Sequence, residues 1–205
     1  MQYFFLLDAN LFQSKVAPAL GAARVAQSFA PARSLCRELN SDPNILVQQG
    51  LHAPADSMVQ RLALGSVPFG RDLWRLLVGE VILLAAAEMP ELETPTDTLA
   101  VLLHLQLGED RPAFSSLQQC LRGSRDLVFG GGYYRPDHAG WNDSADVLRL
   151  AGWLSQIQPA DWTTAHLTSA DAEDELHFAQ EWFPALVEIY RRAVERGYVI
   201  VCEQL

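Results

Sequence analysis

The apolar run at the start of the chain limits the fold more than any other segment. Aromatic and aliphatic side chains fill Tyr3 to Leu7, and the first acidic residue is Asp8. A run of this length without polar alternation is typical of a strand that is buried on both faces. We therefore expect a short strand at residues 1–7 in the interior of a sheet.

The end of the chain predicts a long helix followed by a second strand. Apolar side chains recur at helical spacing from Ala172 to Glu195, and Pro184 interrupts the pattern. Gly197 is placed to end the helix. The residues that follow, Tyr198 to Cys202, form an apolar run rich in β-branched side chains. The chain thus closes on a strand.

Helices dominate the middle of the chain. The segment from Arg71 to about Glu88 is apolar nearly all round, which predicts a buried central helix, and Asp143 or Ser144 caps a later one. Further helices are expected at 14–29, 56–64, 97–107 and 110–121, a turn at 40–44, and short strands at 45–47 and 127–129. No repeat or linker divides the chain. We expect an α+β fold, a helix-rich single domain over residues 1–205 with a small mixed sheet that includes the N-terminal and C-terminal strands.

Charge and cysteine content narrow the partners and the compartment. The 205 residues carry a formal net charge of −10, which disfavours nucleic acid as a bulk partner and suits a basic protein partner or plain solubility. Cys36, Cys120 and Cys202 are odd in number and scattered, as free thiols in a reducing compartment are. Since no apolar stretch has the length of a membrane span or signal core, we expect a cytoplasmic protein without membrane association.

The segment 130–143 is the richest in recognition-type residues. Three consecutive glycines, Gly130 to Gly132, allow positive φ or close approach to a ligand. The residue types that follow are enriched in binding hot spots. We expect a loop whose candidate binding residues are Tyr133, Tyr134, Arg135, Asp137, His138 and Trp141. The alternative is a structural loop whose aromatic side chains fill the core.

Asp8 is a candidate metal ligand because a carboxylate at the end of a buried strand often opens on a cleft. The run from Phe5 to Leu11 resembles the opening motif of the PIN-domain nucleases, and this resemblance implies Asp8 as the first of several metal-binding acids. The later Thr-x-Asp element of that family is missing. The competing interpretation is that Asp8 and Asn10 form an Asx-type turn.

Glu80 is the second candidate metal ligand. Its neighbours at helical spacing are leucines, which places a carboxylate on an apolar face. Burial raises the pKa of such a group and suits a proton carrier or metal ligand. The competing interpretation is a carboxylate that pairs with Arg71 or Arg75 at the edge of the core.

His177 and Glu181 lie four residues apart on the predicted last helix, with Asp174 three residues earlier. Two or three such ligands can hold a metal. The acidic residues around them equally suit the first turn of a solvated helix, and the spacing lacks the second histidine of a His-Glu-x-x-His site. We interpret this group as a solvated face.

The second half of the chain resembles the YfbM-like family of uncharacterised bacterial proteins. The likeness rests on Gly132 to Pro136 before a helix, on Leu186 to Ala193 in the closing helix, and on the final Arg196 to Val201. The resemblance implies an α+β fold and brings no established activity and no catalytic residues.

The sequence contains no coherent catalytic set, so the function that we favour is non-enzymatic. We expect a cytoplasmic protein that binds a partner through the 130–143 segment and its acidic surface, with no cofactor. The alternative is a divalent-metal-dependent phosphoesterase or nuclease with Asp8 as a metal ligand and Glu80 completing the site.

Overall fold

The computed structural model describes residues 1–39, 69–93, 102–105, 111–135, 138–165, 167 and 169–204. The turn predicted at 40–44, the strand at 45–47 and the helix at 56–64 lie outside the described residues. Of the helix predicted at 97–107, only residues 102–105 are described, and they are helical. No helix in the described part of the chain is long and apolar enough to cross a membrane.

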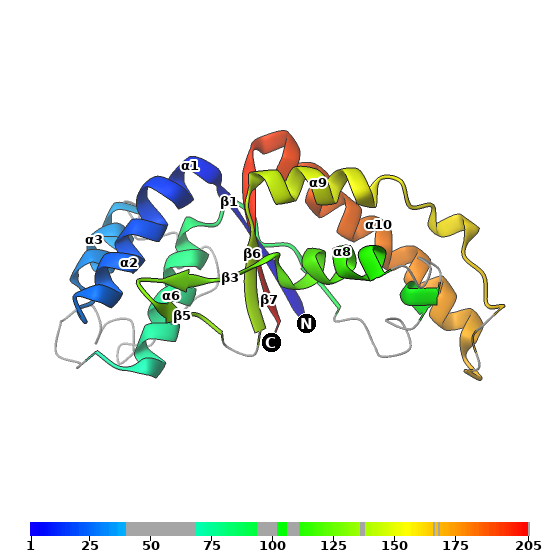
Figure 1. The fold of residues 1–205 in the computed structure, drawn as a ribbon, viewed down its shortest axis with the longest axis horizontal. Helices are drawn as coiled ribbons and strands as arrows, with labels where there is room; N and C mark the ends of the chain where they lie inside the picture. Colours follow the sequence, from blue (N-terminus) through cyan, green and yellow to red (C-terminus); the bar gives the residue numbers. More distant parts are fainter. Residues whose placement is uncertain are drawn as a thin grey trace.

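The centre of the fold is a five-stranded sheet with the order β2-β1-β7-β6-β3. The strands are β2 (Glu91–Leu92), β1 (Gln2–Asp8), β7 (Tyr198–Gln204), β6 (His138–Asn142) and β3 (Arg125–Asp126). The terminal strands pair along their whole length, from Gln2 opposite Gln204 to Asp8 opposite Tyr198. The two ends of the chain therefore lie side by side (Figure 1).

The α+β class and the two terminal strands are confirmed, and the sheet is antiparallel where we expected a mixed one. Every strand pair among the described residues runs antiparallel. The last helix returns the chain to the end of the sheet where β1 finishes, so β7 starts opposite Asp8 and runs back beside β1. Two neighbours joined in this way are antiparallel.

Both faces of the two terminal strands are buried, as the opening run predicts. Phe5 and Leu7 belong to one hydrophobic cluster, which we call the first core. Phe4 and Leu6 belong to a different cluster, the second core. Alternate residues of a strand point to opposite faces of the sheet, so β1 and β7 separate two cores. Figure 1 shows the sheet edge-on with a layer of helices on each side.

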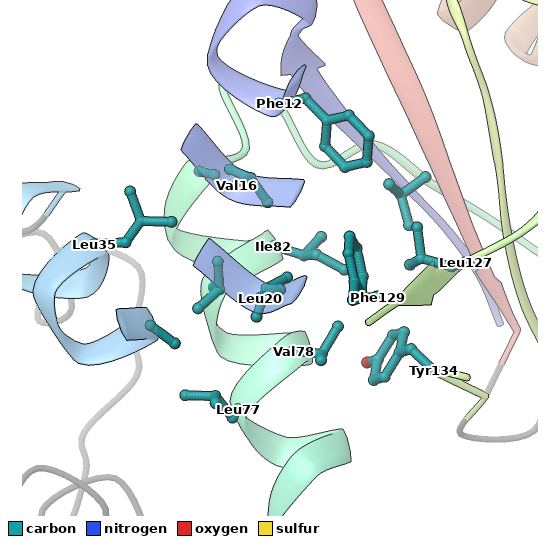
Figure 2. Close-up of a cluster of buried hydrophobic side chains, with 14 of the residues drawn as sticks. Phe12, Val16, Leu20, Leu35, Leu77, Val78, Ile82, Leu127, Phe129 and Tyr134 are labelled. Atoms are coloured by element: carbon teal, nitrogen blue, oxygen red, sulfur yellow. The ribbon is translucent and has the colours of Figure 1, made fainter. Parts of the chain in front are cut away.

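The first core lies under the helices from the first half of the chain. They are α1 (Ala9–Leu11), the π-helical turn η1 (Phe12–Val16), α2 (Ala17–Val25), α3 (Ala30–Leu39) and α6 (Arg71–Ala85). Figure 2 shows Leu77, Val78 and Ile82 of α6 in one cluster with Leu20 of α2. The predicted central helix is thus confirmed, although it ends at Ala85 and leaves Leu76 49% exposed.

The second core lies under α8 (Arg111–Arg122), α9 (Ser144–Leu154) and α10 (Ala172–Arg196), with the 3-10 turn η2 (Pro159–Asp161) beside them. Asp143 caps α9 by accepting a hydrogen bond from the backbone N–H of Asp146. Gly197 ends α10 in the left-handed conformation, with φ 68°. These caps agree with the sequence prediction.

A buried amide joins the parts of the second core. The Asn142 side chain is 0% exposed. Its Nδ2 donates to the Tyr190 hydroxyl at 2.8 Å and to the Gln119 carbonyl at 3.0 Å. Its Oδ1 accepts from the backbone N–H and the hydroxyl of Ser124. The Tyr190 hydroxyl donates in turn to the Cys120 carbonyl at 2.9 Å. One side chain therefore ties β6 to α8, α10 and the segment before β3.

Candidate functional site

The segment 130–142, which we predicted to be a loop, consists largely of strands. Residues 128–133 form a hairpin of β4 (Val128–Phe129) and β5 (Gly132–Tyr133). Gly130 and Gly131 occupy its two-residue turn with φ of 55° and 78°. Positive φ at both central residues is the requirement of a type I′ hairpin turn. Two of the three glycines thus build a turn, and β6 begins at His138.

The strands distribute the predicted binding residues over different surroundings. Tyr133 and Arg135 are exposed, whereas Tyr134 between them is buried because successive side chains of an extended segment point in opposite directions. Trp141 is half-buried and packs on the Phe12 ring at 4.9 Å between centroids. The core-filling alternative therefore holds for Tyr134 and Trp141, whereas Tyr133 and Arg135 are accessible at the surface.

Of the two remaining candidates, the structure describes only His138. A ring nitrogen of His138 lies 3.1 Å from the Arg122 carbonyl oxygen, so this histidine is engaged with the backbone at the end of α8. Asp137 lies outside the described residues.

Tyr133 and Arg135 line a cavity of about 560 Å³ together with three further arginines. Arg24 comes from the last turn of α2, Arg71 and Arg75 come from the start of α6, and Arg135 follows β5. We call this site the arginine pocket. Its other lining residues are Gln27, Phe69, Gly70, Trp74, Gly131 and Gly132.

The hairpin places Arg24 at the pocket. A Cβ atom added to Gly132 would lie 2.6 Å from Nε of Arg24, so only a glycine leaves room for the arginine in its present position. The Arg24 guanidinium carbon lies 5.8 Å from the ring centroid of Phe69 and 5.9 Å from that of Trp74. Aromatic faces attract a cation at this range. The side chain is thereby held between the third glycine and two rings.

The charges of the pocket are only partly neutralised. Arg135 forms an ion pair with Asp126 and lies 5.2 Å from the Tyr133 ring centroid. Arg24, Arg71 and Arg75 form no ion pair with any residue that the structure describes. No acidic residue with a described side chain lines the pocket. The backbone N–H groups at the start of a helix add positive potential. The site is therefore positive within an acidic protein.

No local sequence pattern indicates this pocket. Its arginines come from three segments that are far apart in the chain, so no run of consecutive basic residues marks it. The two arginines at positions 71 and 75 were visible at i, i+4 spacing. At the positive end of a helix such residues are electrostatically unfavourable, and that signal could have marked them as candidates for a functional role.

The structure gives the two metal candidates different roles. Asp8 accepts a hydrogen bond from the backbone N–H of Leu11 at 2.8 Å and so caps α1. This is the turn-forming interpretation of the sequence. Glu80 is half-buried on α6. Burial raises the pKa of Cys36 on α3 to about 12, and the negative charge of Glu80 contributes to the same shift. No group of three metal-ligating side chains occurs among the described residues.

Glu80 also lacks the arginine partner that we expected. It makes no ion pair with a described residue, and both Arg71 and Arg75 line the arginine pocket. Burial raises the pKa of Glu80. His177 and Glu181 form an exposed pair at 3.2 Å, with 74% and 69% of their side chains accessible, which confirms a solvated face.

Comparison with known proteins identifies no relative: no family model, no curated protein and no solved structure matches this chain. The resemblance to the YfbM-like family stays a prediction.

Proposed function

We propose that this protein is a binding protein whose arginine pocket recognises a ligand with at least two negative charges, carried by phosphate or carboxylate groups. The observation that supports the proposal is the convergence of four arginines from three segments on one cavity. Like charges repel one another, so folding brings them together at a cost that an anionic ligand offsets.

The residue types suit this ligand class. A guanidinium group presents a planar set of donors that matches carboxylate and phosphate oxygens in a bidentate way. Tyr133 is 57% exposed at the rim, where an aromatic side chain offers contact area at low entropic cost. The cavity volume of about 560 Å³ lies in the range of small-molecule sites.

Residues 130–135 stay part of the proposed recognition surface, but the proposed ligand is negatively charged. From the net charge we expected a basic partner, whereas the positive pocket suits an acidic group. A basic protein partner stays a separate prediction for the acidic remainder of the surface. We place the protein in the cytoplasm, since Cys36, Cys120 and Cys202 all carry free thiols.

The first test is calorimetric titration of the protein with inorganic pyrophosphate. Arg71→Gln combined with Arg75→Gln should weaken binding by about tenfold or more, because each charge-assisted hydrogen bond contributes roughly 1.5 to 3 kcal/mol. Affinity should also fall as salt rises, since screening acts on the pocket as on any exposed charge.

The matched control is Arg149→Gln combined with Arg191→Gln. Arg149 lies on α9 and Arg191 on α10, over the second core, and their side chains are 50% and 53% accessible. This double variant loses the same two positive charges as the pocket variant. It should bind pyrophosphate as the wild type does. Equal weakening in the two double variants would mean that only overall charge matters, and absence of binding to the wild type would end the proposal.

A further inference from the structure

A second cavity, separate from the arginine pocket, lies on the first-core face of the sheet. Its volume is about 470 Å³. Phe5 of β1, Leu83 of α6 and Met89 after that helix give it apolar walls, and Tyr134 and Glu203 line it as well. Glu88 lies at this cavity too, but its carboxylate is paired with Arg192 and Arg196 of α10. We call this site the Glu203 cavity.

Glu203 interrupts an apolar face of the central strand. On β7 the residues that point into the first core are Val199 and Val201, and the next residue on that face is Glu203. Its direct neighbours are Tyr3 on β1 and Ala139 on β6. The residue is only 7% exposed, so a carboxylate stands where the strand pattern predicts a hydrocarbon side chain.

The carboxylate has one uncharged partner. The Tyr134 hydroxyl donates to Oε1 at 3.1 Å, while the Gln2 amide donates to the backbone carbonyl of Glu203. Among the described residues, Oε2 accepts no hydrogen bond and no cation pairs with the carboxylate. Buried carboxylates are almost always paired with a cation. The cavity therefore offers an apolar wall and an uncompensated negative group.

Tyr134 is fixed in place by α6. A Cβ atom added to Gly79 would lie 2.8 Å from the Tyr134 hydroxyl oxygen, so the glycine lets the phenol lie against the helix. Figure 2 shows the Tyr134 ring beside Val78, with its hydroxyl oxygen directed toward α6. The hydroxyl thus holds one carboxylate oxygen of Glu203 and leaves the other for a ligand.

We propose that the Glu203 cavity binds a small primary amine with an apolar body. The ammonium group lies beside Oε2 of Glu203, and the hydrocarbon part packs on Phe5 and Leu83. The ammonium group supplies the positive partner that Glu203 lacks among the described residues, and the apolar body packs against the walls of the cavity. Among the described residues, this site shares no lining residue with the arginine pocket, so the two proposals can fail independently.

The experiment is calorimetric titration with phenylbutylamine at about pH 8, with phenylbutanol as the uncharged control. The wild type should bind the amine about tenfold more tightly than the alcohol, since hydrogen bonds to charged groups are the stronger ones. Glu203→Gln should lose this preference and leave pyrophosphate binding unchanged. Leu83→Trp, which fills the cavity from the helix and spares the carboxylate, should abolish binding of both compounds.

Thermal unfolding of the same Glu203→Gln variant gives a second readout. Burial raises the pKa of Glu203 above its ordinary value of 4.5, so ionisation is less favourable in the folded chain than in the unfolded one. The wild type therefore loses stability as the pH rises through the folded-state pKa, and the glutamine variant does not. At about pH 8 the variant should melt higher by roughly 2 to 4 °C. The difference should vanish at low pH, where both chains are uncharged at this position.

Two further ionisable side chains lie near the carboxylate at this cavity. Burial and the neighbouring Glu203 raise the pKa of the Tyr134 phenol, and Glu88 forms ion pairs with Arg192 and Arg196. Equal affinity for amine and alcohol, amine binding that survives Glu203→Gln, or no binding by the folded wild type would each overturn the proposal. A glutamine variant less stable than the wild type at about pH 8 would also overturn it, because the carboxylate would then be compensated within the fold.

Discussion

Buried polar residues of this protein fall into two kinds, and their hydrogen bonds distinguish them. Asn142 is fully buried, and both its amide nitrogen and its oxygen have partners, as a structural polar group requires. Glu203 is nearly as buried, yet its carboxylate has one neutral donor. A buried polar group with all its hydrogen bonds made, such as Asn142, stabilises the fold. A buried carboxylate without a charged partner, such as Glu203, lowers the stability of the fold. That contrast is the reason to assign Asn142 a structural role and Glu203 a ligand-binding one.

Replacement of Asn142 by leucine should therefore destabilise the protein. The change leaves the backbone N–H and the hydroxyl of Ser124 without their acceptor, while the Gln119 carbonyl keeps the Gly123 N–H as a donor. Each buried polar group that loses its hydrogen bond costs about 1 to 3 kcal/mol. We expect the free energy of unfolding in urea to fall by about 2 to 4 kcal/mol. Tyr190→Phe should show part of the same loss, because it removes one member of the network. A stability unchanged by Asn142→Leu would show that the network contributes nothing.

At the scale of elements, the strength of the local signal decides what the sequence can predict. The strands β1 and β7 and the helix α10 were predicted because apolar spacing and Gly197 define them locally. The strand β6 was missed because its sequence, His-Ala-Gly-Trp-Asn, has weak strand propensity. Its extended conformation comes from pairing with β7 on one side and β3 on the other. Tertiary context overrides local preference in such a segment.

The β4–β5 hairpin offers a matched set of glycine variants. Gly132→Ala should leave stability within about 1 kcal/mol, because its φ is ordinary and the nearest atoms belong to the flexible Arg24 side chain. It should nevertheless weaken pyrophosphate binding several-fold, since Arg24 must move away from the arginine pocket.

Gly130→Ala is the contrasting change in the same hairpin. Gly130 has a φ of 55°, and a Cβ there would lie 2.6 Å from the backbone oxygen of Gly21. The left-handed conformation alone costs roughly 1 to 2 kcal/mol for a residue with a side chain, so this variant should lose stability clearly in urea unfolding. If Gly132→Ala bound pyrophosphate as the wild type does, Arg24 would not be part of the recognition site.

At the scale of the whole molecule, the sheet separates two cores, and both cavities lie on the side of the first. The arginine pocket and the Glu203 cavity are both lined by α6 and by the segment that contains β5. Neither site could be derived from the sequence, because each depends on side chains that folding brings together from three or more segments. The sequence did single out Tyr133 and Arg135, two residues that line the arginine pocket, and their role in binding stays a prediction. The net charge of −10 led us to expect a basic partner. A sum over the chain does not show where positive charges gather, so it gave no indication of the arginine pocket.

The most direct test of anion recognition follows the arginine side chains themselves during a pyrophosphate titration. In nuclear magnetic resonance spectra that resolve the Nε–Hε groups, the signals of Arg24, Arg71, Arg75 and Arg135 should shift together and saturate at one ligand concentration. The signals of Arg149 and Arg191, on the opposite helical layer, should stay in place. Shifts of similar size at all six arginines, or none at the four that line the pocket, would contradict the account.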